Sequence, residues 1–241
     1  MDIKEETFKS LKRNRVVDDI IDAIKQALIR GDFTPGQRLP SENELAQKLG
    51  VGRGAIREAM KMLSALGVVE IKRGNGTYIT SEPSPILLTP LSFVILLQMG
   101  MTNELLELRS LFQVGYCQLA ARKATGEEME RIAKTLEDWS IIAHEPALDF
   151  DQLVQLDLNF HFAILTATHN PFMIKIGHAI EELFYASMRT SISDAIGLEQ
   201  GIEGHKKILQ ALYSRDPEKI RLSVEESLKN WERGLKKLYP S

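Results

Sequence analysis

The spacing of apolar residues over the first 80 positions predicts three helices followed by a β-hairpin. Apolar residues three and four positions apart, separated by polar ones, are typical of amphipathic helices. Ser41 and Glu44 have the capping-box spacing that begins a helix. Two short β-prone runs joined by a glycine-rich turn at 73–76 predict the hairpin. The expected elements are helices at Val16–Arg30, Ser41–Leu49 and Arg53–Leu66 and strands at Val68–Lys72 and Thr77–Thr80.

Helical spacing continues through the rest of the chain, where no alternating strand pattern occurs. A stretch rich in proline and serine, Ser81–Pro85, separates the two parts. We therefore expect a mainly α protein with one domain at 1–80, a linker at 81–89 and an all-helical bundle of about seven helices at 90–241. The helices expected in the bundle are Leu91–Met99, Thr102–Ala124, Glu127–His144, Leu148–His169, Pro171–Ala195, Glu199–Ser214 and Pro217–Leu238.

The second and third helices have the arrangement of a helix-turn-helix, and the hairpin after them has the position of a wing. In such domains the N-terminal residues of the second of these helices face base edges in the major groove of DNA. Arg53 and Arg57 lie one turn apart there, and arginine binds guanine O6 and N7 with two hydrogen bonds. Gly52 and Gly54 carry no side chain that would hold the helix away from DNA. The alternative is a solvated basic helix face.

Charge is distributed unevenly along the chain. The formal net charge is -3, whereas the segment Phe33–Thr80 contains seven Lys or Arg residues against four Asp or Glu residues. A locally basic segment in an acidic protein is typical of a module that binds a polyanion. Arg73, at the wing, is suited to a narrow minor groove, which attracts arginine.

Composition gives no indication of secretion or of a membrane span. The single cysteine, Cys117, favours a reducing compartment and is expected to be a small buried hydrophobe. The first 15 residues contain no apolar run of the kind found in signal peptides. The most apolar stretch, Ile86–Met101, has 16 residues with Pro90 among them, which is too short to cross a bilayer comfortably. We expect a cytoplasmic protein that does not bind membranes.

The segment Gly31–Thr80 contains, in order, PGQRLPSENELA, LGVGR, REAMKML, GVV and GNGTY. It resembles the winged-helix domain of the GntR family of bacterial transcription regulators. Asn43 stands where one branch of this family often has arginine. The resemblance therefore leaves open whether the same operator bases are read, because asparagine can contact adenine or phosphate. The other positions that match the family's DNA-contacting residues are Arg53, Arg57, Arg73 and Gly74.

Three segments of the helical part resemble the ligand-binding (FCD-type) domain of the FadR-like branch of that family. They are LLELRSLFQVGYCQLAARKAT at 105–125, DLNFHFAILTATHNP at 157–171 and GHKKILQALYSRDPEK at 204–219. The resemblance implies an effector-binding domain. Because a single recognition helix reads only a few base pairs, a homodimer on a palindromic operator is expected.

Asp157 and His161 lie four residues apart and therefore share one helix face. With His205 they form a carboxylate–imidazole set suited to Zn²⁺ or Ni²⁺. In metal-binding members of the branch a fourth histidine ligand occurs 22 residues after the position of His205, where this chain has Ser227. The site would then be completed by water or effector, or be vacant. The alternative is a hydrogen-bonded Asp157–His161 pair in the bundle core.

Arg109 lies among apolar residues that are expected to face the core, so its charge is expected in the interior. A buried arginine needs an anionic partner. The resemblance implies the carboxylate of a small effector, and the alternative is a salt bridge with an acid of the bundle. Asn170 is a weaker effector-binding candidate, with helix capping as its alternative role.

These observations favour a homodimeric repressor or activator whose binding to operator DNA is modulated by a small carboxylate. One alternative is a metal-free regulator of the same family that responds to acyl-CoA, but the retained Asp157, His161 and His205 favour the small acid. A metal-dependent enzyme with an accessory DNA-binding domain is a third interpretation. The sequence contains no nucleophile motif, phosphate-binding loop or well-spaced general base to support it.

Overall fold

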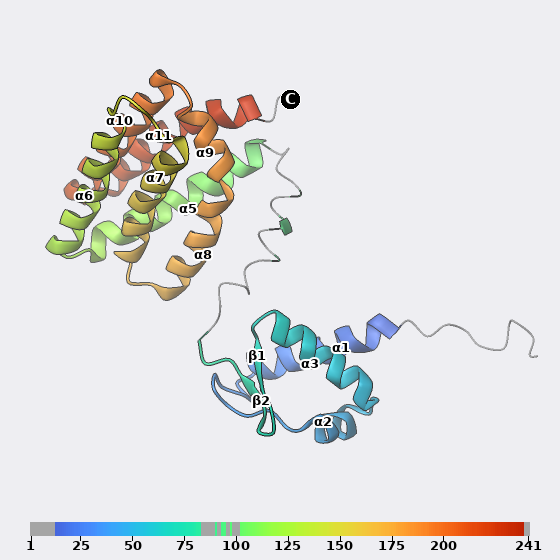
Figure 1. Ribbon diagram of the computed structural model, residues 1–241. Helices are drawn as coiled ribbons and strands as arrows, with labels where there is room; N and C mark the ends of the chain where they lie inside the picture. The colour runs from blue at the N-terminus through green and yellow to red at the C-terminus, as the bar shows by residue number, and fades with distance from the viewer. Residues whose placement is uncertain (1–12, 83–89, 91–92, 95–96, 98–101, 239–241) are drawn as a thin grey trace, which may run out of the picture. The chain divides into compact units, whose positions relative to one another are not determined.

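The computed structural model describes residues 13–82, 90, 93–94, 97 and 102–238. The chain divides into two compact units, residues 1–87 and 88–241 (Figure 1). Each unit contains its own hydrophobic core. The helix expected at Leu91–Met99 lies largely outside the described residues. None of the described helices is long and apolar enough to cross a membrane.

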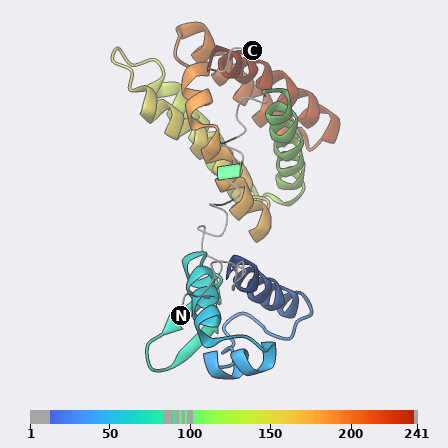
Figure 2. The same ribbon diagram turned by 90° about the vertical axis from the view of Figure 1, so that its right-hand side faces the viewer.

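The first unit is a three-helix domain with a two-stranded wing (Figures 1 and 2). Its elements are α1 (Arg13–Ile29), α2 (Glu42–Leu49), α3 (Arg53–Ala65), β1 (Val69–Lys72) and β2 (Gly76–Ile79). The strands are antiparallel, with Val69 opposite Ile79. Helix α3 packs against α1, α2 and β1. Its buried residues Ile56, Ala59 and Met60 anchor it in the core and leave its opposite face to solvent.

Capping residues set the boundaries of α2 and α3. The Ser41 hydroxyl accepts from the Glu44 N–H, and the Glu44 carboxylate accepts from the Ser41 N–H at 2.7 Å, so the predicted capping box is confirmed. Gly50 ends α2 with φ 64°, a backbone conformation that favours glycine. Gly52 is the N-cap of α3, and because glycine has no side chain it makes no capping hydrogen bond. The chain therefore turns from α2 into α3 within three residues.

The second unit is an all-helical bundle. Its described elements are α5 (Thr102–Lys123), α6 (Gly126–Ile142), α7 (Phe150–Thr166), α8 (Pro171–Leu183), α9 (Tyr185–Ser191), α10 (Ala195–Ser214) and α11 (Pro217–Leu238). Helix α11 packs against α5, α9 and α10, while α7 packs against α5, α6 and α8. The core includes the fully buried residues Tyr116, Trp139 and Phe160. Cys117 is also fully buried, as predicted.

The single helix predicted at Pro171–Ala195 is wrong, because the chain breaks at Phe184 into α8 and α9. Phe184 is fully buried, has φ -90° and ψ 3°, and packs edge-on against Trp231. The predicted start of the next helix at Glu199 is also wrong. Helix α10 begins at Ala195, where the Asp194 carboxylate accepts from the Gly197 N–H at 2.7 Å.

Candidate functional site

Two arginines project from the exposed face of α3 in the first unit. Arg57 donates from Nε and Nη2 to one carboxylate oxygen of Glu42, each at 3.2 Å. Arg53 donates from Nη1 to the Asn43 side-chain oxygen at 3.3 Å. Both acceptors belong to the first turn of α2, so this turn orients both guanidinium groups. The role of Glu42 was not predicted from the sequence.

The surface around these arginines is open. Gly52 and Gly54 are exposed, and a Cβ at either position would meet no heavy atom within 4 Å. In the wing, Arg73 and Gly74 are exposed in the turn between β1 and β2, where Gly74 has φ 73°. The first unit therefore presents exposed cations on both the helix and the wing, and side chains do not crowd the start of the helix.

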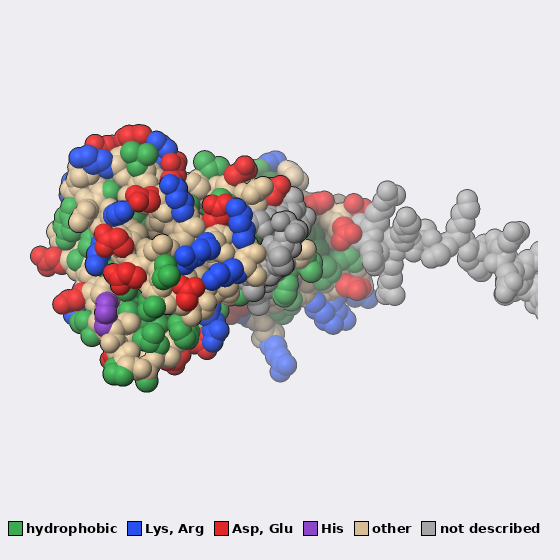
Figure 3. Space-filling model, turned by 90° about the horizontal axis from the view of Figure 1, so that it is seen from above, with side chains coloured by type: hydrophobic (Ala, Val, Ile, Leu, Met, Phe, Trp, Pro, Cys, Tyr) green, Lys and Arg blue, Asp and Glu red, His purple; other side chains and the backbone are tan. Residues whose placement is uncertain are grey.

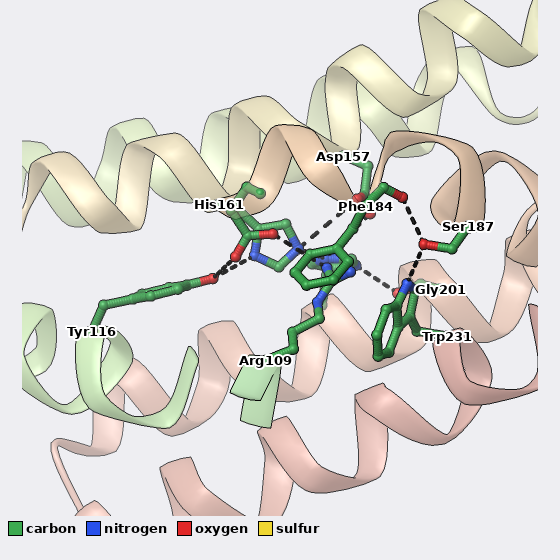
Figure 4. A network of polar contacts seen from close by, with 10 residues as sticks. Arg109, Tyr116, Asp157, His161, Phe184, Ser187, Gly201 and Trp231 are labelled. Carbon is green, nitrogen blue, oxygen red and sulfur yellow. Dashed lines mark hydrogen bonds and ion pairs between the residues drawn. The ribbon is translucent and has the colours of Figure 1, made fainter. Parts of the chain in front are cut away.

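In the second unit, one carboxylate and two imidazoles converge in the bundle interior (Figure 4). Asp157 and His161 come from α7 and His205 comes from α10, and all three are buried. His205 Nε2 lies 3.4 Å from Asp157 Oδ1 and 3.1 Å from His161 Nε2. His161 Nε2 lies 3.9 Å from Asp157 Oδ2. Among the described residues, this is the cluster whose ligand atoms are close enough together to bind one metal ion.

The hydrogen-bond partner of Nδ1 fixes the tautomer of His205. Nδ1 lies 2.8 Å from the backbone oxygen of Gly201, one turn earlier on α10. A carbonyl oxygen can only accept, so Nδ1 carries the proton. In a neutral imidazole Nε2 then presents its lone pair. That lone pair is directed toward His161 and Asp157.

The tautomer of His161 depends on Tyr116, which lies beside it in Figure 4, and on the buried Glu181. Tyr116, from α5, places its hydroxyl 2.8 Å from His161 Nδ1 and 3.0 Å from Glu181 Oε1. The other oxygen of Glu181 forms an ion pair with Arg109 Nη2 at 3.3 Å. Because this carboxylate accepts only, the phenol donates to Glu181 and the phenol oxygen accepts from His161 Nδ1–H.

The opposite arrangement, with a proton on His161 Nε2, lets His161 donate to His205 Nε2 at 3.1 Å but leaves the Tyr116 oxygen facing a buried carboxylate oxygen of Glu181. In the first arrangement two imidazole lone pairs and a carboxylate meet at one point, which a divalent cation would stabilise. Burial also lowers the pKa of His161 well below its ordinary value, which keeps the imidazole neutral near pH 7. Burial and the nearby Glu181 raise the pKa of the Tyr116 phenol, so it keeps its proton.

A cavity of about 40 Å³ adjoins this cluster, and Arg109, Asp157, His161 and His205 are among the residues that line it. Arg109 is 4% exposed, and its guanidinium lies 4.8 Å from the Phe184 ring and 4.7 Å from the Trp231 ring. Arg109 Nε and Nη1 are buried and have no hydrogen-bond partner among the described residues. An arginine with two unused donors beside a cation-binding cluster is suited to a carboxylate that contacts both.

The structure brings together Arg109, Asp157, His161 and His205, as the sequence analysis expected, and Ser227 also lines the cavity. It does not bring Asn170 there, because Asn170 caps α8 by accepting from two backbone N–H groups. The ion-pair partner of Arg109 within the bundle is Glu181, which the sequence analysis did not identify. Tyr116 was also missed, although it follows Arg109 by seven residues, two turns along the same face of α5.

The other three histidines lie apart from the cluster. His144 contacts the Ser140 backbone oxygen at 2.6 Å, and His169 contacts the Glu128 carboxylate at 2.8 Å. His178 stacks on Phe162.

Comparison with known proteins agrees with this division into two units. Residues 16–79 match the family model for bacterial regulatory proteins of the gntR family, and residues 104–230, over half of the chain, match the FCD domain. The HTH-type transcriptional regulator LutR of Bacillus subtilis is 31% identical over 187 residues, which cover 76% of this chain and 84% of LutR. The galactonate operon transcriptional repressor of Escherichia coli is 25% identical and covers 92% of this chain and 97% of the relative.

Among solved structures, Streptococcus agalactiae GntR superposes with a TM-score of 0.56 and covers 90% of this chain and 99% of that chain. At 24% sequence identity, this likeness shows the fold.

A winged helix-turn-helix unit joined to an all-helical unit with a buried polar cluster defines a DNA-binding transcription regulator with an effector-binding domain, and not an enzyme. The chain belongs to the GntR family of bacterial regulatory proteins, and its FCD domain fits the FadR-like subfamily. The predicted fold class, family and regulatory function are confirmed.

Proposed function

We propose that this regulator binds a small carboxylate effector in the cavity of the second unit, through a divalent metal ion and Arg109, and that the effector modulates binding of a homodimer to palindromic operator DNA. One observation carries the proposal. Arg109 is buried with two unused donors and lines the same small cavity as Asp157, His161 and His205. A carboxylate ligand would satisfy the arginine and complete the coordination of a metal.

The donor set suits the metal. Two imidazole Nε2 atoms and one carboxylate are ligands that Zn²⁺ and Ni²⁺ accept. Ser227 lines the cavity but is a poor metal ligand, so the remaining coordination positions are left to water or effector. When bound, the ion supplies positive charge that attracts the carboxylate oxygens of an effector. Tyr116 and the Gly201 carbonyl contact the Nδ1 atoms of the two histidines, which leaves both Nε2 atoms to bind the ion.

The size of the cavity supports a small effector. A space of about 40 Å³ has room for a few waters or a small acid group and not for a fatty acyl chain. The name of one relative refers to galactonate, which is a small hydroxy acid. Both points favour a carboxylate over the acyl-CoA alternative.

In the first unit, we assign base contact in the major groove to Arg53 and Arg57, with Gly52 and Gly54 allowing close approach. Asn43 holds Arg53 in position and has its amide N–H groups available for adenine or phosphate. Arg73 and Gly74 reach the minor groove from the wing. The protein acts in the cytoplasm, where its operator DNA is found.

A switch requires the effector to bind one state of the dimer more tightly than another. Gel shifts with the operator, in the presence and absence of an effector found by binding, measure this difference directly. An effector that binds the protein and changes operator affinity supports the switch. Equal operator affinity with and without that effector contradicts it.

The metal is tested by elemental analysis of purified protein. We expect His205→Ala to lower the metal content, because it removes one of three ligands. The matched control is His144→Ala, at an exposed histidine away from the cluster, which should leave the content unchanged. Equal metal content in wild-type protein and in His205→Ala would refute the three-residue site.

A further inference from the structure

The small buried cavity adjoins a larger surface hollow between α10 and α11. Ser227 and Asn230 line both the inner cavity of about 40 Å³ and this outer hollow of about 400 Å³. These two side chains are the ones that the two spaces share. The small residues Gly204 and Ser227 face each other at this point, and a Cβ at Gly204 would lie 2.8 Å from Ser227 Oγ. The helices therefore meet here through their smallest side chains, next to the proposed effector site.

Cations outnumber anions in the lining of the outer hollow. The charged lining residues are Lys207, Lys229, Arg233, Glu203 and Glu226. Lys207 is paired with Glu226 at 2.9 Å, and Glu203 is paired with Lys206 at 3.6 Å. Arg233 pairs more loosely, with Asp194 at 3.8 Å, so Lys229 and Arg233 are the cations of the hollow that are held least by short ion pairs among the described residues.

Arg233 is held in place in the outer hollow by Asn230, which also lines the inner cavity. Its Nη2 donates to the Asn230 side-chain oxygen at 3.0 Å, and Asn230 donates from Nδ2 to the Gly197 backbone oxygen at 2.8 Å. Asp194 lies 3.8 Å from Arg233 Nη2. The Nε atom of Arg233 is buried and has no hydrogen-bond partner among the described residues. Arg233 is thus oriented by protein contacts, and one of its donors is unsatisfied among the described residues.

The cationic character continues along α11. A second shallow hollow shares Lys229 and Arg233 with the first and adds Lys236, Lys237 and Glu232 to its lining. Lys236 pairs with Glu232 at 2.6 Å and Lys237 pairs with Asp194 at 3.0 Å. Acidic and basic side chains are intermixed on the face of the molecule in Figure 3. The lining of the two hollows contains more cations than anions. It provides an approach for an anionic ligand.

We propose that this hollow is a second effector subsite, in which Lys229 and Arg233 bind a second anionic group of the effector. This inference rests on the proposed function, since it takes the inner cavity as the site of the first carboxylate. The effector class is then a small acid with a carboxylate at one end and a phosphate or second carboxylate at the other. Such a molecule would extend past Asn230 and Ser227, which line both spaces. Arginine and lysine are the usual protein donors to phosphate and carboxylate.

The experiment is isothermal titration of the full-length, zinc-loaded protein with paired ligands of increasing length. Each pair contains a hydroxy acid and the same acid with a terminal phosphate: glycerate with 3-phosphoglycerate, and gluconate with 6-phosphogluconate. We expect the phosphorylated member of one pair to bind about tenfold more tightly, the contribution of one charge-assisted contact. Lys229→Gln and Arg233→Gln should each reduce this gain while leaving the affinity for the unphosphorylated acid unchanged. Lys219→Gln, on the same helix but outside both hollows, is the matched control and should keep the gain.

The outcomes separate this inference from the proposed function. If the unphosphorylated acids bind but the phosphate brings no gain in either pair, the second subsite is wrong and the first carboxylate site stands. If the phosphate raises the affinity equally in wild-type protein, Lys229→Gln and Arg233→Gln, the second subsite is also wrong. If no member of either pair binds to the zinc-loaded protein, the proposed function and this inference both fail. Melting curves of the ligand-free variants confirm that each substitution leaves the fold intact.

Discussion

Tyr116 gives the most specific prediction about the buried cluster, because it touches the proposed metal ligand without being a ligand itself. Tyr116→Phe removes a hydroxyl that lies 2.8 Å from His161 Nδ1 and 3.0 Å from Glu181 Oε1. The ring remains, so the packing of this fully buried side chain is retained. His161 then loses the acceptor that fixes its tautomer, and one oxygen of Glu181 loses its donor.

The expected magnitude follows from these two lost contacts. Leaving a buried polar group without its partner costs about 1–3 kcal/mol. Changes to groups that orient a metal-binding histidine typically lower metal affinity by about 10- to 100-fold. We therefore expect the zinc dissociation constant of Tyr116→Phe to rise by roughly 10- to 100-fold, equivalent to about 1.4–2.7 kcal/mol. The affinity is measured by competition with a chromophoric zinc chelator at pH 7.5.

The matched control is Tyr213→Phe, which makes the same change at a tyrosine that is 55% exposed. This variant should bind zinc as the wild-type protein does. If Tyr116→Phe also binds zinc with unchanged affinity, the hydroxyl does not position His161. The assignment of the two Nε2 lone pairs to a metal would then lose its main support.

Three further predictions concern Arg57, His161 and Asn170. Arg57→Ala should abolish sequence-specific operator binding in gel shifts while leaving the melting temperature unchanged, and unaltered sequence preference would remove Arg57 from base readout. In metal-free protein the folded state disfavours protonated His161, whereas the unfolded chain protonates it below about pH 6.5. The free energy of unfolding should therefore fall as the pH drops below that value, and it should fall less in His161→Gln. Denaturant titrations at pH 7 and 5.5 measure this loss, and an equal loss in wild-type protein and in His161→Gln would contradict the reasoning. Asn170→Ala removes the N-cap of α8 and should cost about 1 kcal/mol of stability without changing effector affinity; a weaker effector affinity at unchanged stability would return Asn170 to the binding site.

Much of the first unit was predictable because its determinants are local. The Ser41–Glu44 capping box and the glycine turn at Gly50 act within one turn of the backbone, and the structure confirms both. The pairing of Arg57 with Glu42 was not predictable in the same way, since the two residues are 15 positions apart and meet only when α2 packs against α3.

In the second unit, the three cluster residues were predicted from spacing and resemblance, but their surroundings were not. Glu181 lies 72 residues after Arg109 on a different helix, α8, so only tertiary packing brings the two together. The break between α8 and α9 at Phe184 has no local sequence signal either. The gap predicted between the helices ending at Ala195 and starting at Glu199 contains Gly197, yet Gly197 lies inside α10. Its missing side chain serves close packing, because a Cβ there would collide with the Ser191 carbonyl oxygen. Tertiary contacts decided each of these features.

The central claim is that one small cavity binds a carboxylate through a metal and Arg109, and a thermal-melt scan tests it most directly. Zinc-loaded full-length protein is melted with a panel of small carboxylates and acyl-CoAs, with and without chelator. A ligand at 100 times its dissociation constant adds about 2.7 kcal/mol, which shifts the melting temperature by roughly 5–10 °C. We predict a shift with a small acid that is lost after chelation and in Arg109→Gln. A shift with acyl-CoA alone, unaffected by chelator, would contradict the account and make the two histidines structural.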